Sequence, residues 1–392
     1  MGIKRLCGFL HDMNVVKHYD TLNDFMENHF KKNSYTNYCK LGIDSSVYIR
    51  RYMHVHGKYY TLALLKQSLG FLLHNVIPVY IFDGKPPDGK KDVIQQRRVR
   101  RNKNKMRLKN VEQQRFNFMN NHEYISNKIY QSNYEKEILR IKRQLVQIHK
   151  QDVINIKEML NICNIPYIQS TEEADPMLGE LYRQGFIDIA LSYDMDLLLK
   201  GCDRVISFTA GGHIYEYNLD YILDGLKLTY AQFIDMCILF GCEEVKPFIN
   251  INKPDDTNEI LNQHDIYSLI IKHQNIEGII IALYGKHKNV SSIQIAEYLE
   301  KCNIARYNYN NRNIELVDKK FTTIINKGVD FNTLYQYIIN TCIASKMMVE
   351  GECYSPDSNV PFMSRDGTLN MYQIYNMVHK LNHRIINRSY MM

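Results

Sequence analysis

The chain has 392 residues, 45% of them hydrophobic, and a formal net charge of +7. This length and composition predict a globular protein that buries one large core or two ordinary ones. We expect no membrane span and no secretory signal, because no run approaches ~18 apolar residues and the N-terminus lacks an apolar core. Nine cysteines without a C-x-x-C pair argue against a disulfide framework and against a zinc site.

Short apolar runs alternate with segments of helical periodicity along the chain. The apolar runs predict strands over residues 39–44, 77–83, 187–194 and 204–208. The helical spacing predicts helices over residues 61–76 and 174–185. This alternation predicts an α/β fold, with helices flanking a parallel-rich, twisted sheet whose ligands bind beyond the carboxyl ends of the strands.

Acidic residues end three of the predicted strands. Asp44 and Asp83 close the first two, and Asp194 with Asp196 closes the third. A parallel sheet would gather these ends along one edge as a patch of negative charge that requires cations. An Asp at a strand end, taken alone, is usually the N-cap of the next helix, but the D-M-D stretch cannot place both of its carboxylates in one cap.

Glu173 and Asp175 add two acids in the stretch "QSTEEADPMLGE". Ser170 and Glu173 have the spacing of a capping box, and Asp175 before Pro176 has the position of a cap, so both acids have a structural explanation as well. Hard oxygen ligands without histidine or thiolate favour Mg²⁺ or Mn²⁺. Two such ions can activate water and stabilise the leaving oxygen of a phosphodiester, so the acids suggest metal-dependent phosphodiester hydrolysis.

The charge of the chain is unevenly distributed. Between Gly84 and Lys150 there are 18 Lys+Arg and 6 Asp+Glu residues, so this segment carries +12 and the remainder −5. A basic segment beside an acidic body is typical of a protein that holds a polyanion with one part and metal ions with another. A solvated helical hairpin rich in Lys and Arg explains the same composition.

Seven stretches, in this order, carry a family resemblance: "MGIKRL", "LGIDSSVYI", "PVYIFDGKPP", "NIPYIQSTEEADP", "SYDMDLLLKG", "MCILFGCEE" and "IIKHQNIEGI". Their order and rough spacing resemble the flap endonuclease family, the XPG-like 5′ nucleases. The resemblance covers about residues 1 to 283. It implies a 5′-nuclease or PIN-like core with an inserted basic helical arch and a mainly helical C-terminal part.

The resemblance also implies the site residues. The family's two-metal centre, holding two Mg²⁺ ions that Mn²⁺ can replace, corresponds to Asp44, Asp83, Glu173, Asp175, Asp194, Asp196 and Glu243. The last position is Asp in the family, and Glu244 is the alternative ligand here. Lys90 and Arg97 match the catalytic Lys and Arg of the arch, which stabilise charge on the scissile phosphate. The implied DNA contacts are Gly2, Arg50, Arg98, Arg100, Arg101, Lys103 and Lys105.

The aromatic residues of the arch have two possible roles, base stacking and packing between helices. Phe116, Phe118 and Tyr124 offer stacking surfaces for single-stranded DNA, although packing between helices explains them better.

Besides Glu243, the chain departs from the family in three places. Ile260 and Asn262 stand where the family's helix-hairpin-helix has glycines, and Arg50 stands where a tyrosine stacks on the flap junction, with Tyr48 two residues away. No Q-x-x-L-x-x-F-F sliding-clamp motif occurs near the C-terminus. These departures would suit a member from a large DNA virus. The predicted regions are 1–87 (N-terminal nuclease), 88–150 (basic arch), 151–245 (internal nuclease), 246–290 (degenerate helix-hairpin-helix) and 291–392 (C-terminal extension of unknown role).

The sequence as a whole predicts a metal-dependent nuclease that cuts DNA at 5′ flaps or single-strand/duplex junctions during replication, repair or recombination. The alternatives are a 5′→3′ exonuclease, a junction resolvase, or a non-catalytic DNA-structure-binding protein that keeps the fold. We expect an intracellular monomer with no membrane partner, acting in the nucleus, or at cytoplasmic replication sites if the protein is viral.

Overall fold

The computed structural model describes residues 3–32, 38–86, 91–120, 128–209, 211–250, 259–284 and 292–310, with short pieces at 333–334, 336–337, 349–350, 369–370 and 376–379. The chain divides into two compact units, and each is described by itself. Unit 1 comprises Met1–Asp44, Phe71–Ile81 and Ala174–Thr323. Unit 2 comprises Ser45–Gly70, Phe82–Glu173 and Ile324–Met392.

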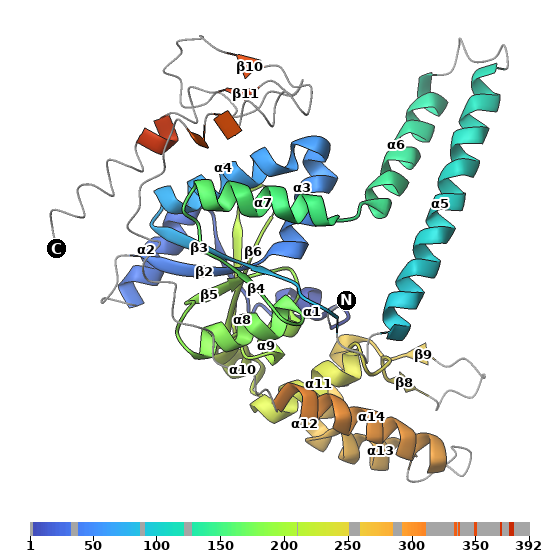
Figure 1. Cartoon of the computed structure of the whole chain (residues 1–392). Coiled ribbons are helices and arrows are strands. Elements are labelled where there is room, and N and C mark those ends of the chain that lie inside the picture. The colour runs from blue at the N-terminus through green and yellow to red at the C-terminus, as the bar shows by residue number, and fades with distance from the viewer. Residues whose placement is uncertain are drawn as a thin grey trace. The chain divides into compact units, whose positions relative to one another are not determined.

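The fold is built on a seven-stranded sheet with the order β1-β7-β6-β5-β2-β3-β4 (Figure 1). The strands are β1 (Lys17–Tyr19), β2 (Cys39–Asp44), β3 (Val76–Phe82), β4 (Tyr167–Gln169), β5 (Ile189–Leu191), β6 (Arg204–Phe208) and β7 (Ile214–Asn218). β2 pairs in parallel with β3 and β5, and β5 with β6, whereas β7 is antiparallel to β6 and β1. All residues of β3 are buried, as expected of a strand covered on both faces. The predicted parallel-rich α/β fold is confirmed.

Unit 1 places one set of helices against the sheet and a second set in a bundle. The helices are α1 (Leu6–Asp12), α2 (Leu22–Lys32), α8 (Ala174–Arg183), α9 (Asp196–Leu199), α10 (Leu219–Leu226), α11 (Tyr230–Phe240), α12 (Gln263–His273), α13 (Ile276–Tyr284) and α14 (Ser292–Asn310). α8 packs against β2 and β5, α9 against β6, and α10 against β7 (Figure 1). A short ribbon of β8 (Ile249–Asn250) and β9 (Glu259–Ile260) precedes α12.

A single guanidinium group joins three helices of the bundle. Arg306 of α14 donates to both carboxylate oxygens of Asp235 in α11, each at 2.6 Å, and to Glu277 of α13 at 2.6 and 2.9 Å. Asp235 is 5% exposed and also accepts the backbone N–H of Ile276 at 3.2 Å. A buried carboxylate is stable only when its charge is paired and its oxygens are hydrogen-bonded, and this network satisfies both conditions.

One of the glycine replacements noted in the sequence has a local structural role. Asn262 is the N-cap of α12: its side-chain oxygen accepts the backbone N–H of Asp265 at 2.9 Å. Asp265 accepts the N–H of Asn262 at 3.3 Å in return, which completes a capping box.

Unit 2 contains α3 (Ser45–His56), the 3₁₀ turn η1 (Gly57–Tyr59), α4 (Tyr60–Leu73, whose last residues belong to unit 1), α5 (Lys91–Asn120), α6 (Lys128–Leu145), α7 (Lys150–Ile162) and the parallel pair β10 (Val349–Glu350) and β11 (Leu369–Asn370). The Tyr60 hydroxyl of α4 donates to Asp152 of α7 at 2.7 Å. None of the helices in the described ranges has the length and apolar character needed to cross a membrane.

Candidate active site

Two predicted metal ligands follow neighbouring parallel strands of unit 1. Asp44 is the last residue of β2, and Asp194 follows β5, which ends at Leu191. β2 and β5 pair in parallel with Ile43 opposite Leu191. Parallel strands end at the same edge of a sheet, so both acids lie at the carboxyl edge, where the sequence predicted a ligand site. Asp44 is 5% exposed.

Backbone amides fix the carboxylates of Asp194 and Asp196. The N–H of Asp196, the first residue of α9, donates to Asp194 Oδ1 at 3.1 Å. Asp196 Oδ1 in turn accepts the N–H of Ile3 at 2.6 Å and is almost fully buried. The D-M-D stretch therefore presents both carboxylates from one tight turn, with the N-terminal segment of the chain as a fixed donor.

Asp175 enters the same site from the first turn of α8. Its Oδ2 accepts a hydrogen bond from Lys200 Nζ at 2.8 Å, so the residue is held in an ion pair and does not cap α8. α8 also lies very close to the backbone after α9: a Cβ added at Gly179 would lie 1.8 Å from the carbonyl oxygen of Lys200. Glycine at this position therefore allows the close approach that brings Asp175 and Lys200 together.

The site has more negative than positive charge. Burial, followed by the negative charge of Asp194, raises the pKa of Asp196 to about 7, although Lys200 and the Ile3 amide oppose this change. Burial alone would lower the pKa of Lys200, but Asp175 and Asp196 outweigh it and raise that pKa above its ordinary value. Three crowded carboxylates with one ammonium group favour a further cation. Their hard oxygen donors are the ligand type that Mg²⁺ and Mn²⁺ prefer.

Glu243 lies on the turn that follows α11. Gly241 has φ +100° at the end of the helix, and its carbonyl accepts the N–H of Lys4 at 3.1 Å. Glu243 is half-buried, whereas Glu244 is exposed and accepts a hydrogen bond from Asn308 at 3.5 Å. The N-terminal residues thus hold both the Asp196 carboxylate and the turn that carries Glu243.

Asp83 and Glu173 lie in unit 2, on two hydrogen-bonded segments. Ser170 N–H donates to Phe82 O at 2.9 Å, and Lys85 N–H donates to Thr171 O at 3.1 Å. A Cβ at Gly84 would lie 2.3 Å from the carbonyl oxygens of Ser170 and Thr171, so these segments need glycine there. Asp83 is exposed and Glu173 is half-buried.

The capping box proposed for Ser170 and Glu173 does not account for the Ser170 hydroxyl. This group donates to the backbone carbonyl of Glu173 at 3.0 Å and accepts the N–H of Glu172 at 3.3 Å. The serine therefore shapes the backbone of the turn before α8.

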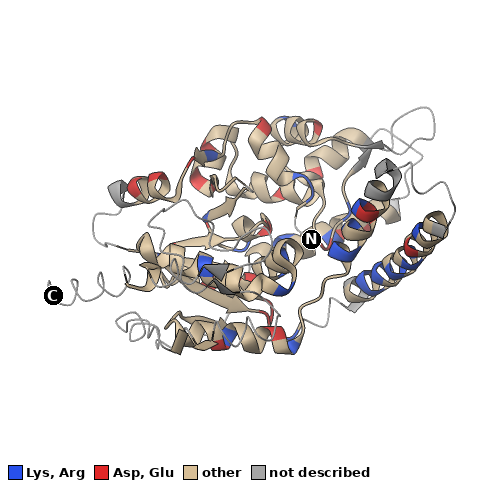
Figure 2. Cartoon of the chain, turned by 90° about the horizontal axis from the view of Figure 1, so that it is seen from above, with Lys and Arg blue, Asp and Glu red and all other residues tan. Residues whose placement is uncertain are grey.

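The predicted arch is a pair of helices in unit 2. Arg107 and Arg115 of α5 form ion pairs with Glu137 and Glu135 of α6 at 2.7 and 3.5 Å. α5 contains ten Lys+Arg and two Asp+Glu residues, and Figure 2 shows basic residues along its length. Its predicted DNA-contacting residues Arg97, Arg98, Arg100, Lys103 and Lys105 are exposed, and Arg101 is half-buried. No ion pair joins any of the six to another described residue.

The remaining predicted contacts have different placements. Arg50 is exposed on α3, whereas Tyr48 is 1% exposed and therefore cannot offer a stacking face. Phe116 is 60% exposed, while Phe118 packs against Tyr134 with ring centroids 5.8 Å apart. Gly2, Lys90 and Tyr124 lie outside the described residues.

Two compact groups of metal-ligating side chains occur among the described residues, and neither contains a predicted ligand. His18, Asp20 and His213 form one, and His29, Cys39 and Asp188 form the other. In the second group the Arg204 guanidinium lies 3.2 Å from His29 Nδ1, and burial followed by the charge of Arg204 lowers the pKa of His29. The positive charge of this guanidinium beside His29 disfavours a bound cation, so we assign the second group no metal.

Two groups of the candidate site, the Lys200 side chain and the backbone N–H of Ile3, were not predicted from the sequence. Lys200 has a visible signal, because it follows Asp196 by four residues and this spacing places oppositely charged side chains on one helical face. The donor at Ile3 is a backbone N–H, which the amino-acid type at that position does not reveal.

Comparison with known proteins gives two matched domains. Residues 1–104 match the XPG N-terminal domain and residues 164–243 match the XPG I-region. All nine predicted catalytic and metal-binding residues lie within these two ranges.

Curated relatives include "Flap endonuclease 1" of Aedes aegypti, 28% identical over 56% of this chain and 53% of its own length. The protein of the same name from Drosophila mojavensis is 29% identical over 48% of this chain and 44% of its own length. The chain thus spans about half of the length of the curated relatives it matches.

Solved structures share the fold. The catalytic core of Rad2 in complex with DNA substrate has a TM-score of 0.56 at 15% identity, covering 87% of this chain and 95% of that one. Flap endonuclease-1 from Methanococcus jannaschii has a TM-score of 0.53 at 14% identity, covering 89% of this chain and 93% of that one.

Proposed function

We propose that the chain is a member of the XPG-like family of flap endonucleases and that it is a structure-specific 5′ nuclease that hydrolyses DNA phosphodiesters. The observation that carries the proposal is the convergence of Asp175, Asp194 and Asp196 around one ammonium group in unit 1. Such an excess of partly buried carboxylate charge is unfavourable for folding, and it is expected where a protein must bind divalent cations.

The proposed metal ligands are Asp44, Asp83, Glu173, Asp175, Asp194, Asp196 and Glu243, and the proposed ions are two Mg²⁺, for which Mn²⁺ can substitute. Bound ions of this kind supply a nucleophilic water and neutralise the leaving oxygen. Along the chain, Glu173 and Asp175 flank a single residue, and Asp83 directly follows β3, the parallel neighbour of β2. The half-buried side chain of Glu243 favours it over the exposed Glu244 as the seventh ligand.

The basic helix α5 and the residue before it supply most of the proposed contacts to DNA. Lys90 and Arg97 would stabilise negative charge that develops on the scissile phosphate. The exposed side chains of Arg98, Arg100, Lys103 and Lys105 would contact the backbone of a single-stranded 5′ segment, with the exposed ring of Phe116 available to stack on a base.

The proposed substrate is DNA with a 5′ flap or a single-strand/duplex junction. The proposed setting is intracellular, at sites of replication, repair or recombination, in the nucleus or at viral replication sites in the cytoplasm. The protein is expected to act as a monomer without a sliding-clamp contact.

The decisive experiment compares wild type with Asp194→Asn on end-labelled 5′-flap, nicked, blunt and four-way DNA, in Mg²⁺ and in EDTA. Asp220→Asn, which removes an exposed acid of α10, is the matched control. We expect wild type and the control to cut in Mg²⁺ only, with Asp194→Asn inactive. Incision concentrated at the flap supports the flap nuclease, whereas preference for blunt ends or four-way DNA favours the exonuclease or resolvase. No cutting in Mg²⁺ or Mn²⁺ refutes catalysis.

One observation favours a second candidate function, a non-catalytic protein that binds DNA structures. The Lys200 ammonium lies 2.8 Å from Asp175 Oδ2 and already neutralises one proposed ligand. Titration of the DNA-free protein with Mn²⁺, followed by electron paramagnetic resonance, separates the candidates. The nuclease requires Mn²⁺ binding that is lost in Asp194→Asn, whereas the non-catalytic candidate requires equal, weak binding by both.

A further inference from the structure

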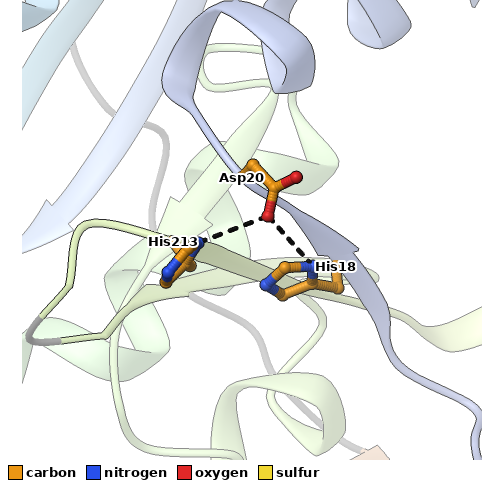
Figure 3. Close-up of side chains that lie close together, drawn as sticks. All are labelled: His18, Asp20 and His213. Carbon is orange, nitrogen blue, oxygen red and sulfur yellow. Dashed lines mark ion pairs between the residues drawn. The ribbon is translucent and has the colours of Figure 1, made fainter.

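Three metal-ligating side chains meet at the β1 edge of unit 1, and none belongs to the proposed nuclease site (Figure 3). His18 lies in β1, and Asp20 follows this strand directly. His213 precedes β7, which pairs antiparallel with β1 so that His18 faces Tyr215. The pairing of these two strands therefore brings the three side chains together.

The distances from Asp20 Oδ1 to the two imidazoles are close to those of a tetrahedral metal site. Asp20 Oδ1 lies 3.8 Å from His18 Nδ1 and 3.4 Å from His213 Nδ1. With metal–ligand distances of about 2.0–2.1 Å, two ligands of a tetrahedral ion lie roughly 3.3–3.4 Å apart. All three ligand atoms lie within 4.8 Å of one another, so small side-chain rotations would complete the geometry.

Helix capping does not explain why Asp20 points at the histidines, with which it forms ion pairs when they are protonated. The N-terminus of α2 is already capped, because Thr21 Oγ1 accepts the N–H of Asp24 at 3.2 Å and Asp24 Oδ2 accepts the N–H of Thr21 at 3.0 Å. The separations of Asp20 from His18 and His213 exceed the usual length of an N–H···O hydrogen bond, about 2.7–3.2 Å.

The two imidazoles are held in place by their surroundings. The backbone of His213 is fixed from both sides, since its N–H donates to Thr209 Oγ1 at 3.1 Å and its carbonyl accepts the N–H of Thr209 at 2.9 Å. The His18 ring packs against Tyr215 and His213, with ring centroids 5.2 and 5.3 Å away. Positioned imidazoles bind a metal ion without the entropic cost of ordering them.

We propose that His18, Asp20 and His213 form a binding site for a transition-metal dication such as Zn²⁺, with water as the fourth ligand. Two imidazoles and one carboxylate are a ligand set that zinc accepts, and borderline nitrogen donors favour it over Mg²⁺. The side chains are 45%, 75% and 47% exposed, so the ion can enter from solvent. The cysteine pattern that argued against zinc does not bear on this site. Binding would fasten β1, a three-residue edge strand, to the β6–β7 turn.

The test measures Zn²⁺ affinity of the full chain by competition with a chromophoric chelator, in excess Mg²⁺ so that hard carboxylate sites are filled. We expect wild type to bind one Zn²⁺, and His18→Asn, Asp20→Asn and His213→Asn to bind it at least ~10-fold more weakly, because even a lost outer partner of a ligand typically costs that much. X-ray absorption at the zinc edge should report two imidazoles in wild type and one in His213→Asn.

Two further variants, His264→Asn and Asp194→Asn, test whether zinc binding is specific to this site. His264 lies 3.7 Å from Asp12, and no third ligand group joins this pair in the described part of the chain, so His264→Asn should bind Zn²⁺ like wild type. Equal binding by wild type and the three site variants overturns the proposal. Loss of zinc only in Asp194→Asn also overturns it, because the ion would then lie among the carboxylates.

Discussion

Asp196→Asn should make the metal-free protein more stable at neutral pH, although it removes a proposed metal ligand. Asparagine keeps an oxygen that can accept the N–H of Ile3, the 2.6 Å hydrogen bond of the wild type, but it carries no negative charge. The substitution therefore removes the repulsion from Asp194 and the cost of burying an ionised group, while the main hydrogen bond remains.

The raised pKa of Asp196 determines how much Asp196→Asn should stabilise the folded protein and in which pH range. Burial and the charge of Asp194 raise this pKa from 3.8 to about 7, a difference that corresponds to at most about 4 kcal/mol at 1.36 kcal/mol per pKa unit. Because Asp196 titrates together with its charged neighbours, we expect a gain of about 1–3 kcal/mol. A raised pKa means that the folded state binds the proton more tightly than the unfolded state. The destabilisation of the folded state by ionised Asp196 is thus absent below pH ~4 and grows until about pH 7.

The assay is urea unfolding of wild type and Asp196→Asn in EDTA at pH 4.5, 6 and 8. Asp220→Asn, an exposed acid of α10, should change the free energy of unfolding by less than about 0.5 kcal/mol at every pH. The reasoning fails if Asp196→Asn is no more stable than wild type at pH 8, or if its advantage is as large at pH 4.5. Added Mg²⁺ should stabilise wild type more than the variant.

Three further substitutions have defined outcomes. Lys200→Met removes the ammonium beside Asp175 and should tighten Mn²⁺ binding on the order of 10-fold, measured by electron paramagnetic resonance; unchanged affinity would show that Lys200 does not compete with the ion. Arg306→Met leaves Asp235 buried and unpaired and should lower the free energy of unfolding in urea by about 3 kcal/mol. Adding Asp235→Asn to this variant should restore part of the loss, and a loss within experimental error would contradict the network. Gly84→Ala forces a Cβ against two carbonyl oxygens and should cost about 1–3 kcal/mol and reduce flap cleavage; wild-type melting and cleavage would argue against a need for glycine.

The elements that the sequence predicts well are short apolar runs with clear boundaries. The predicted bounds of β2 and β6 coincide with the observed strands, because turn residues flank both. β1 was missed, since "KHY" is a three-residue polar edge strand whose pairing depends on β7 and not on its own composition. The antiparallel end of the sheet was unpredictable for the same reason.

Residue type and spacing predict the acids of the candidate site but not the interactions that position them. Asp44 and Asp194 were expected at strand ends because a parallel sheet fixes that geometry. The Ile3 amide, the close approach at Gly179 and the ion pair of Lys200 depend on tertiary packing. The carbonyl-lined contact at Gly84 likewise depends on tertiary packing.

The α5–α6 hairpin has a consequence for how the molecule responds to salt and to polyanions. Its cross-helix ion pairs are solvent-exposed, and each such pair contributes only about 0–1 kcal/mol. Backbone amides in α5 should therefore exchange with deuterium well before those of the buried strand β3. Any polyanion that binds this helix in its folded form raises the free energy of local opening, so slowed exchange along α5 would report occupancy directly, even for a variant that cannot cut.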